Sequence, residues 1–425
     1  MPSLMPLLGL LSPSIHVTNN VLVLSSDIFE EPRARFLYYA RRICIISSIE
    51  SLSFHRSSLY CGNTGRRLGR IISVGDPDGE HGSPLRDLVN TLGSAAPSLQ
   101  RLALSGNMHP LAVLSVSELQ DLRAFQFINR SVVDIGTWFP PVLQSCAALE
   151  MLQDLALTVQ ETRNRDAPTF SGFRRLRSLL AQGRITVISR FCETILSTQL
   201  LSVTAFVSRP DSWREYRAYF ETLSARFGRS LRAVHISGTW VGDVSSRTRP
   251  LEMIRPLMGL HELEEVCVIS GTGIGLSLTN SDVLELAKCW PSLTEFKLLY
   301  QAIPATLPAS SLVAFAQHCP HLHTLWLASI DLKNLGRECS DAYPASHHGL
   351  RSIWLVGHIP SDGREKLAQL IDHIFPSVNS APMKLDWHPS SDEAGWCDIC
   401  TFTYLLPPSH NWVVRKFVTH ALYLS

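Results

Sequence analysis

Three groups of residues have types and spacings that could bind a cofactor or a metal ion. The first is Gly271-Thr-Gly-Ile-Gly275, which follows a predicted strand, where a dinucleotide-binding loop would lie. The GxGxxG fingerprint needs a further glycine at the position of Leu276. We therefore interpret the run as a connecting loop and expect no cofactor.

The second group is Cys397-Asp-Ile-Cys400, which has zinc-ligand spacing and lies near His388 and His410. A structural zinc site needs four ligands, usually from two paired Cys motifs, and the sequence has no second pair. A redox role would need a βαβ context, which the surrounding sequence lacks. We expect two ordinary cysteines and no metal.

The third group consists of histidines: His318, His321 and His323, followed by the pair His347-His348. Position 323 lies at the start of a predicted strand and should be exposed, which favours a solvated cluster over a metal site. No Ser-His-Asp set, nucleophile elbow or carboxylate pair stands out. The sequence therefore predicts a protein that is not an enzyme.

The amino-acid composition argues against nucleic acids and membranes as binding partners. Among 425 residues, 38 are basic and 37 acidic, and 45% are hydrophobic, so neither a nucleic-acid footprint nor a polybasic membrane patch is visible. No run approaches the roughly 20 apolar residues of a membrane helix, and Met1–Leu11 lacks the basic start of a signal peptide. The ten cysteines have no disulfide-framework spacing, which favours free thiols in the cytoplasm or nucleus.

The elements that would position such residues follow a repeated sequence pattern. It occurs in Ser281–Leu298 and again in Ser310–Leu327. With an offset of 29 residues, both copies place apolar residues, a proline and a Leu-x-x-Leu-x-Leu-like frame at matching positions. An offset near 30 with this frame marks a leucine-rich repeat.

Each copy combines a helix with a strand. Val283, Leu286, Ala287 and Trp290 form the apolar stripe of a helix, which Ser281 or Asp282 should cap and Pro291 should end. The period then drops to two, as in a strand. A single helix and strand cannot bury their apolar faces, so the units must stack. We predict an α/β leucine-rich-repeat solenoid, a horseshoe with a concave parallel sheet and outer helices.

The strand frame recurs at Leu99/Leu102/Leu104, Leu122/Phe125/Phe127, Leu152/Leu155/Leu157, Leu231/Val234/Ile236, Leu263/Val266/Val268 and Leu350/Ile353/Leu355. Between Leu176 and Phe206 we expect degenerate units at Arg184–Ser189 and Leu201–Val207. Further helices are predicted over Glu31–Ile46, Asp211–Phe227 and Ser361–Phe375. The expected organisation is an N-terminal segment with a flexible loop (1–84), a solenoid (85–376) and a C-terminal tail (377–425) that could pack on the last repeats.

Four stretches carry a family resemblance: Arg35-Phe-Leu-Tyr-Tyr-Ala-Arg-Arg42, Asp282-Val-Leu-Glu-Leu-Ala-Lys-Cys-Trp-Pro-Ser-Leu293, Phe315-Ala-Gln-His-Cys-Pro-His-Leu322 and Ile371-Asp-His-Ile-Phe-Pro376. Through them the chain resembles the F-box/leucine-rich-repeat proteins of mushroom-forming fungi. The resemblance implies a substrate-recognition subunit of a cullin–RING ubiquitin ligase, in which the F-box holds the adaptor and the repeats hold the substrate.

The F-box itself is not found in this chain, because nothing before Arg35 fits that helical module. We expect an F-box upstream of this sequence or, without one, an F-box-less remnant that does not co-purify with the adaptor. A free-standing leucine-rich-repeat scaffold with no ligase link is the alternative. In either case the predicted partner is a protein bound on the concave face.

The residue between the last two core positions of each strand should point away from the core. These residues are His235, Cys267, Lys297, Trp326 and Trp354. We predict a partner-binding patch built on His235, Lys297, Trp326 and Trp354, with both indole rings facing solvent. Two alternatives stay open: the apolar tail Thr401–Leu424 folds back over the rings, or a register shift of one residue buries them.

Overall fold

The computed structural model describes residues 15–18, 21–24, 51–55, 98–106, 110–129, 139–159, 171–241, 250–270, 278–299, 307–308, 311–328, 330–331, 348–356 and 363–378. The predicted helix at Glu31–Ile46, the Gly271–Gly275 loop, the Cys397/Cys400 pair and the Thr401–Leu424 tail all lie outside these ranges. None of the helices within the described ranges is long and apolar enough to cross a bilayer.

The chain forms two compact units, one of residues 1–209 and 221–231 and the other of residues 210–220 and 232–425. The elements of the first unit are β1 (Ile15–Thr18), β2 (Val21–Leu24), β3 (Ser51–His55), β4 (Arg101–Gly106), η2 (Pro110–Glu118), β5 (Ala124–Asn129), α4 (Phe139–Ala147), β6 (Asp154–Thr158), β7 (Ser178–Gly183), α5 (Ile185–Thr194) and β8 (Ser202–Ser212). The last residues of β8 (210–212) belong to the second unit, and helix α6 (Trp213–Phe227) contributes residues to both units.

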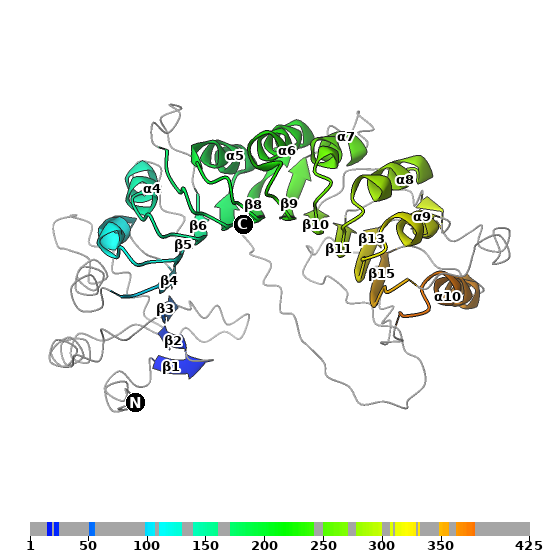
Figure 1. Cartoon of the computed structure of the whole chain (residues 1–425), viewed down its shortest axis with the longest axis horizontal. Coiled ribbons are helices and arrows are strands. Elements are labelled where there is room, and N and C mark those ends of the chain that lie inside the picture. Colours follow the sequence, from blue (N-terminus) through cyan, green and yellow to red (C-terminus); the bar gives the residue numbers. More distant parts are fainter. Residues whose placement is uncertain are drawn as a thin grey trace, which may run out of the picture. The chain divides into compact units, whose positions relative to one another are not determined.

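The elements of the second unit are β9 (Ala233–Val241), α7 (Pro250–Ile254), η4 (Arg255–Gly259), β10 (Glu265–Ser270), α8 (Asn280–Cys289), β11 (Glu295–Leu299), β12 (Leu307–Pro308), α9 (Ser311–His318), β13 (Thr324–Ala328), β14 (Ile330–Asp331), β15 (Ser352–Val356) and α10 (Gly363–Ile374). Figure 1 shows α8, α9 and α10 on one side of the strands of this unit.

The strands follow chain order within each unit, as stacked repeats require. In the first unit β1 pairs antiparallel with β2, and β2 through β8 are parallel neighbours. In the second unit β9, β10, β11, β13 and β15 are parallel neighbours, and β12 pairs with β14. The chain is thus an α/β leucine-rich-repeat solenoid, as the sequence predicts.

The predicted strand frame is also the observed core. Phe296 of β11 aligns with Val266 of β10 and Leu325 of β13, and all three side chains are buried. The stripe of α8 is buried as well, and Trp290 is among the largest fully buried side chains. Within the second unit, neighbouring strands therefore align their apolar side chains in rows that pack beneath the helices.

The middle of the chain was only partly predicted. Leu201–Val207 falls on β8 as expected, but the proposed unit at Arg184–Ser189 is wrong because Ile185 begins helix α5. The missed strand is β7, in which Leu179 and Ala181 are buried, and Leu176 is buried just before it. Ala181 stands where most other units have a larger apolar residue, and Ala205 of β8 occupies the same register position.

The predicted helices of the second half are confirmed, with α6 beginning at Trp213 and α10 spanning Gly363–Ile374. The predicted cap of α8 is wrong. Thr279 is the N-cap: its side chain accepts a hydrogen bond from the Asp282 N–H, and the Asp282 carboxylate accepts one from the Thr279 N–H at 2.8 Å. This reciprocal arrangement is a capping box, which satisfies two donors of the first turn.

A chain of side-chain hydrogen bonds links the ends of the repeat helices. Trp290 Nε1 donates to the Leu257 carbonyl at 3.2 Å, and Cys319 Sγ lies 3.7 Å from the Trp290 carbonyl. His348 Nε2 lies 2.7 Å from the Cys319 carbonyl. Positions 290, 319 and 348 are 29 residues apart, so one place in each repeat reaches back to the helix end of the preceding unit. The Leu257, Trp290 and Cys319 carbonyls each also accept a hydrogen bond from the backbone N–H three residues further on, so these side-chain contacts are second bonds to carbonyls that are already paired.

Candidate interaction surface

The five residues that the sequence places between core positions lie side by side in the second unit. His235 aligns with Cys267, Cys267 with Lys297, Lys297 with Trp326, and Trp326 with Trp354. Adjacent parallel strands are about 4.8 Å apart, so the five form one continuous row across the sheet. Because their sequence neighbours are buried beneath the helices, the row belongs to the opposite face. We call this side the open face of the second unit; it corresponds to the predicted concave face.

The row is most tightly organised around Trp326. The ammonium group of Lys297 lies 4.3 Å from the centroid of the Trp326 ring and 2.6 Å from Glu295 Oε1. On the neighbouring strand, the Trp354 ring meets Trp326 at 4.3 Å between centroids and 79° between planes. Trp326 is thus contacted by a cation from one strand and by an aromatic ring from the next, a combination that holds its side chain in place.

The prediction that both rings face solvent is wrong for Trp354. Its side chain is only 7% exposed, whereas Trp326 is partly exposed. Burial does not come from a register shift, because Trp354 aligns with Trp326 and Leu355 aligns with the buried Leu327. The edge-to-face contact with Trp326 covers part of the ring. Trp354 therefore packs behind Trp326, and Trp326 is the tryptophan that a partner could contact.

The other end of the row is polar. His235 Nε2 lies 3.0 Å from Glu265 Oε2, and the histidine is charged only if protonated. Cys267 lies between His235 and Lys297 and is partly exposed. Burial raises the pKa of the Cys267 thiol, and the positive charge of nearby Lys297 offsets only part of this rise. The resulting pKa is about 11. The thiol is neutral at pH 7 and adds no charge to the row.

Two functional candidates were missed in the sequence: Glu265 and Glu295. They are register partners on β10 and β11, each two residues before a member of the row. The same period-two alternation that selected Cys267 and Lys297 also selects these carboxylates, so the signal was present in the sequence.

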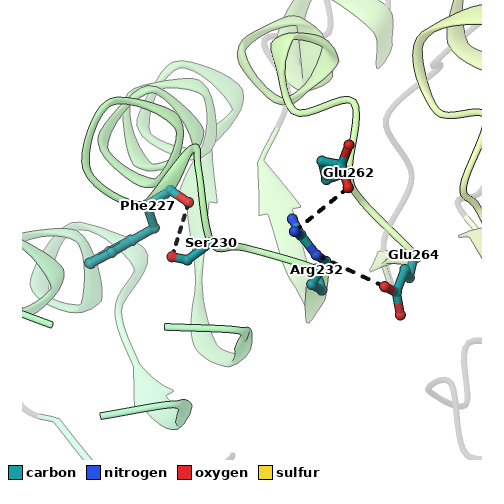
Figure 2. A network of polar contacts seen from close by, with 5 residues as sticks. All are labelled: Phe227, Ser230, Arg232, Glu262 and Glu264. Carbon is teal, nitrogen blue, oxygen red and sulfur yellow. Dashed lines mark hydrogen bonds and ion pairs between the residues drawn. The ribbon is translucent and has the colours of Figure 1, made fainter. Parts of the chain in front are cut away.

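In this part of the unit the carboxylates are more exposed than the cations they pair with. Arg232 forms ion pairs with Glu262 and Glu264 (Figure 2), with N–O distances of 3.6 Å and 3.9 Å. The exposed fractions of the acidic side chains are 68% for Glu262, 54% for Glu264, 44% for Glu265 and 27% for Glu295. Those of their basic partners are 32% for Arg232, 31% for His235 and 18% for Lys297. Among these ion pairs, a binding partner would therefore meet mainly the negatively charged carboxylates.

The histidines considered as metal ligands differ in their exposure to solvent. His323 is exposed, as predicted, and so is His321. His348 is instead a buried core residue that packs edge-on against Phe375. Among the residues that the structure describes, no group of three His, Cys, Asp or Glu side chains is arranged to hold a metal ion.

His348 should make the stability of the second unit depend on pH. Its Nδ1 accepts a hydrogen bond from the Leu350 N–H at 3.1 Å, so that nitrogen must be unprotonated. Burial lowers the pKa of His348 despite the hydrogen bond to the Cys319 carbonyl. The unfolded chain therefore binds a proton near pH 6.5 that the folded chain resists, and stability falls as pH drops from about 7 to 5.

We expect His348→Gln to reduce the slope of unfolding free energy against pH in this window. One proton contributes at most about 1.4 kcal/mol per pH unit. Urea unfolding followed by circular dichroism from pH 7.5 to 5 measures the slope. His321→Gln, an exposed change in the neighbouring repeat, is the control and should keep the wild-type slope. Equal slopes for the two variants would contradict the assignment.

Comparisons with known proteins add little beyond the fold. No family model matches the sequence, and no curated protein matches it. Loosely similar solved structures include a chain of the yeast Rad7–Elc1 complex, with 13% identity over 69% of this chain and 71% of that chain and a TM-score of 0.40. The leucine-rich-repeat-containing protein LegL7 from Legionella pneumophila shows 12% identity over 84% of this chain and 98% of that chain, with a TM-score of 0.38.

A protein from Bacteroides fragilis shows 14% identity over 70% of each chain, with a TM-score of 0.35. Likenesses at these TM-scores assign neither an activity nor a partner. The class of the protein is thus defined by its own repeats and strand register, as a leucine-rich-repeat scaffold.

Proposed function

We propose that this chain is a protein-interaction scaffold that binds a partner protein on the open face of its second unit. The observation that carries the proposal is Trp326, a partly exposed tryptophan fixed between Lys297 and Trp354 on a regular sheet. Tryptophan is the residue most enriched in binding hot spots, and side chains that are already ordered lose less entropy on binding.

The row around Trp326 supports the same function. His235, Cys267 and Lys297 are partly exposed and come from three neighbouring strands, so a partner can touch several repeats at once. A sheet built from stacked repeats offers an extended and rigid platform of this kind.

The role within the cell follows from the sequence resemblance. We propose that the scaffold serves as the substrate-recognition part of an F-box/leucine-rich-repeat ubiquitin ligase, or as an F-box-less remnant of one, in the cytoplasm or nucleus. A free-standing scaffold is the alternative. Mixing the purified chain with the cullin adaptor tests ligase recruitment by this chain. A stoichiometric complex supports recruitment and contradicts the free-standing scaffold, whereas the absence of a complex, which we expect, fits the F-box-less remnant and the free-standing scaffold equally.

The binding proposal is tested with Trp326→Ala in the full chain. We expect protein fragments selected by the wild type, from a displayed cDNA library of a mushroom-forming fungus, to bind this variant about 30-fold more weakly, the effect of a hot-spot residue. Calorimetric titration measures the affinity. Glu285→Gln, on an exposed position of α8, is the control and should bind like the wild type.

Circular dichroism melts must show that Trp326→Ala remains folded, and Trp326→Phe should recover part of the affinity. Selected fragments that bind Trp326→Ala as tightly as the wild type would place the interaction elsewhere and contradict the proposal.

A further inference from the structure

The charges of the open face define what kind of partner it accepts. We propose that the partner contributes a lysine- or arginine-bearing segment, whose cation binds the Glu265 and Glu295 carboxylates and whose stem packs against Trp326. This inference rests on the proposed function and adds the chemistry of the partner.

The two carboxylates lie on neighbouring strands and point to the same face. Glu265 and Glu295 are register partners, so their strands run side by side at this point. Two like charges at opposed positions destabilise a sheet unless a cation lies near them. Lys297 and, when protonated, His235 meet part of this need from within the chain.

The compensation is incomplete. Glu265 and Glu295 carry two negative charges, and Lys297 supplies one positive charge to the same part of the face. The Cys267 thiol, which lies between His235 and Lys297 in the row, is neutral. One negative charge therefore stays unmatched whenever His235 is neutral, and a cation from a partner would balance it.

Exposure points in the same direction. Among His235, Glu265, Glu295 and Lys297, the Glu265 side chain is the most exposed and the Lys297 side chain the least exposed. An acidic partner would meet the carboxylates first and would have to reach past Glu295 to contact the ammonium group. A basic partner meets its counter-charges at the surface, where they also steer its approach.

The contact between Lys297 and Trp326 is an example, from within the chain, of an alkylammonium group packed on this surface. The ammonium lies 4.3 Å from the ring centroid with a carboxylate oxygen at 2.6 Å, which combines a cation–π contact with an ion pair. A lysine or arginine from a partner would use the same two kinds of group. Lys297 then acts as an internal competitor, and its removal should improve binding.

The test uses the full chain and a phage-displayed library of random 16-residue peptides. We expect the selected peptides to be enriched in lysine and arginine relative to the unselected library. Their dissociation constants, measured by fluorescence anisotropy, should rise about tenfold or more with the double substitution Glu265→Gln and Glu295→Gln. The control is Glu193→Gln with Glu285→Gln, which makes the same change of charge on exposed positions of α5 and α8 and should leave binding unchanged.

Lys297→Met is the decisive variant. A basic peptide should bind it at least as tightly as the wild type, and several-fold tighter where the peptide cation takes the place of the Lys297 ammonium. An acidic peptide should lose binding, because the Lys297 ammonium group that it would pair with is gone. Loss of the selected peptides with Lys297→Met, with circular dichroism showing an intact fold, would overturn the inference.

The remaining outcomes separate this inference from the proposed function. Selected peptides that are acidic or purely apolar, and that fail to bind Trp326→Ala, would overturn the inference and leave the open face as a binding site. Peptides that bind Trp326→Ala normally would overturn both. The absence of any selected peptide would also count against both, as expected for a face that another segment of the chain already covers.

Discussion

Replacing Leu325 with aspartate is expected to unfold the second unit. Leu325 is fully buried on β13, between register partners Phe296 on β11 and Ile353 on β15. Losing a buried leucine costs about 1.5–3 kcal/mol, and an unpaired carboxylate in its place adds several kcal/mol more. Together these exceed about 4 kcal/mol, a large share of the stability of a typical domain.

The damage should spread beyond one repeat. Each repeat is stabilised mainly by its neighbours, so the loss of β13 removes a partner from both β11 and β15. Urea unfolding followed by circular dichroism should show a lower midpoint or, at 25 °C, a chain already partly unfolded in buffer.

Two substitutions serve as controls for Leu325→Asp. Leu325→Met keeps the volume and should cost less than about 1.5 kcal/mol. His323→Asp introduces the same carboxylate at an exposed position two residues earlier and should change stability by no more than about 0.5 kcal/mol. An unchanged midpoint for Leu325→Asp would disprove the alternation assigned to β13.

The parts of the fold that the sequence predicts are those in which two independent signals agree. Pro291 and Pro320 each follow the apolar stripe of a helix and precede a strand frame, and α8, α9, β11 and β13 fall where these signals place them. The alternation within the frame then fixes which side chains share a face. That is why the sequence alone predicts the row from His235 to Trp354.

The sequence fails where a repeat is shorter or loses its large apolar residues. Leu152, Leu176 and Leu200 are spaced by 24 residues each, against 29 in the clearest repeat pair. Both short units also have alanine at the last core position, as Ala181 and Ala205, so their strand frames contrast less with the surrounding sequence than the others do. The frame was therefore shifted to Arg184–Ser189, which is the start of a helix.

The candidate surface was predicted in position but not in exposure. Alternation states which face Trp354 occupies, yet it does not state how far the neighbouring ring covers it. That depends on the rotamers of Trp326 and Trp354, which three-dimensional packing decides. The pairing of Glu265 with His235 likewise joins residues 30 positions apart, which only the strand register brings together.

Replacing Trp290 with alanine is expected to be the most damaging neutral substitution that we propose. The ring is fully buried, lies 6.0 Å from the Phe296 ring between centroids, and donates from Nε1 to the Leu257 carbonyl. The Trp290 carbonyl also accepts from the Leu293 N–H and lies near Cys319 Sγ of the following repeat. One residue thus joins three consecutive repeats.

We expect Trp290→Ala to cost about 3–5 kcal/mol, the range for deleting a large aromatic side chain from a core. Trp290→Phe keeps most of the ring contacts and loses the Nε1 hydrogen bond to the Leu257 carbonyl, which still accepts from the Leu260 N–H. The lost bond should cost about 0.5–1.5 kcal/mol. Urea midpoints from circular dichroism give both values. Trp326→Ala removes the same number of atoms from the partly exposed row, and its cost should be clearly smaller. If Trp290→Ala and Trp326→Ala were equally destabilising, the assignment of Trp290 to the core and Trp326 to the open face could not stand.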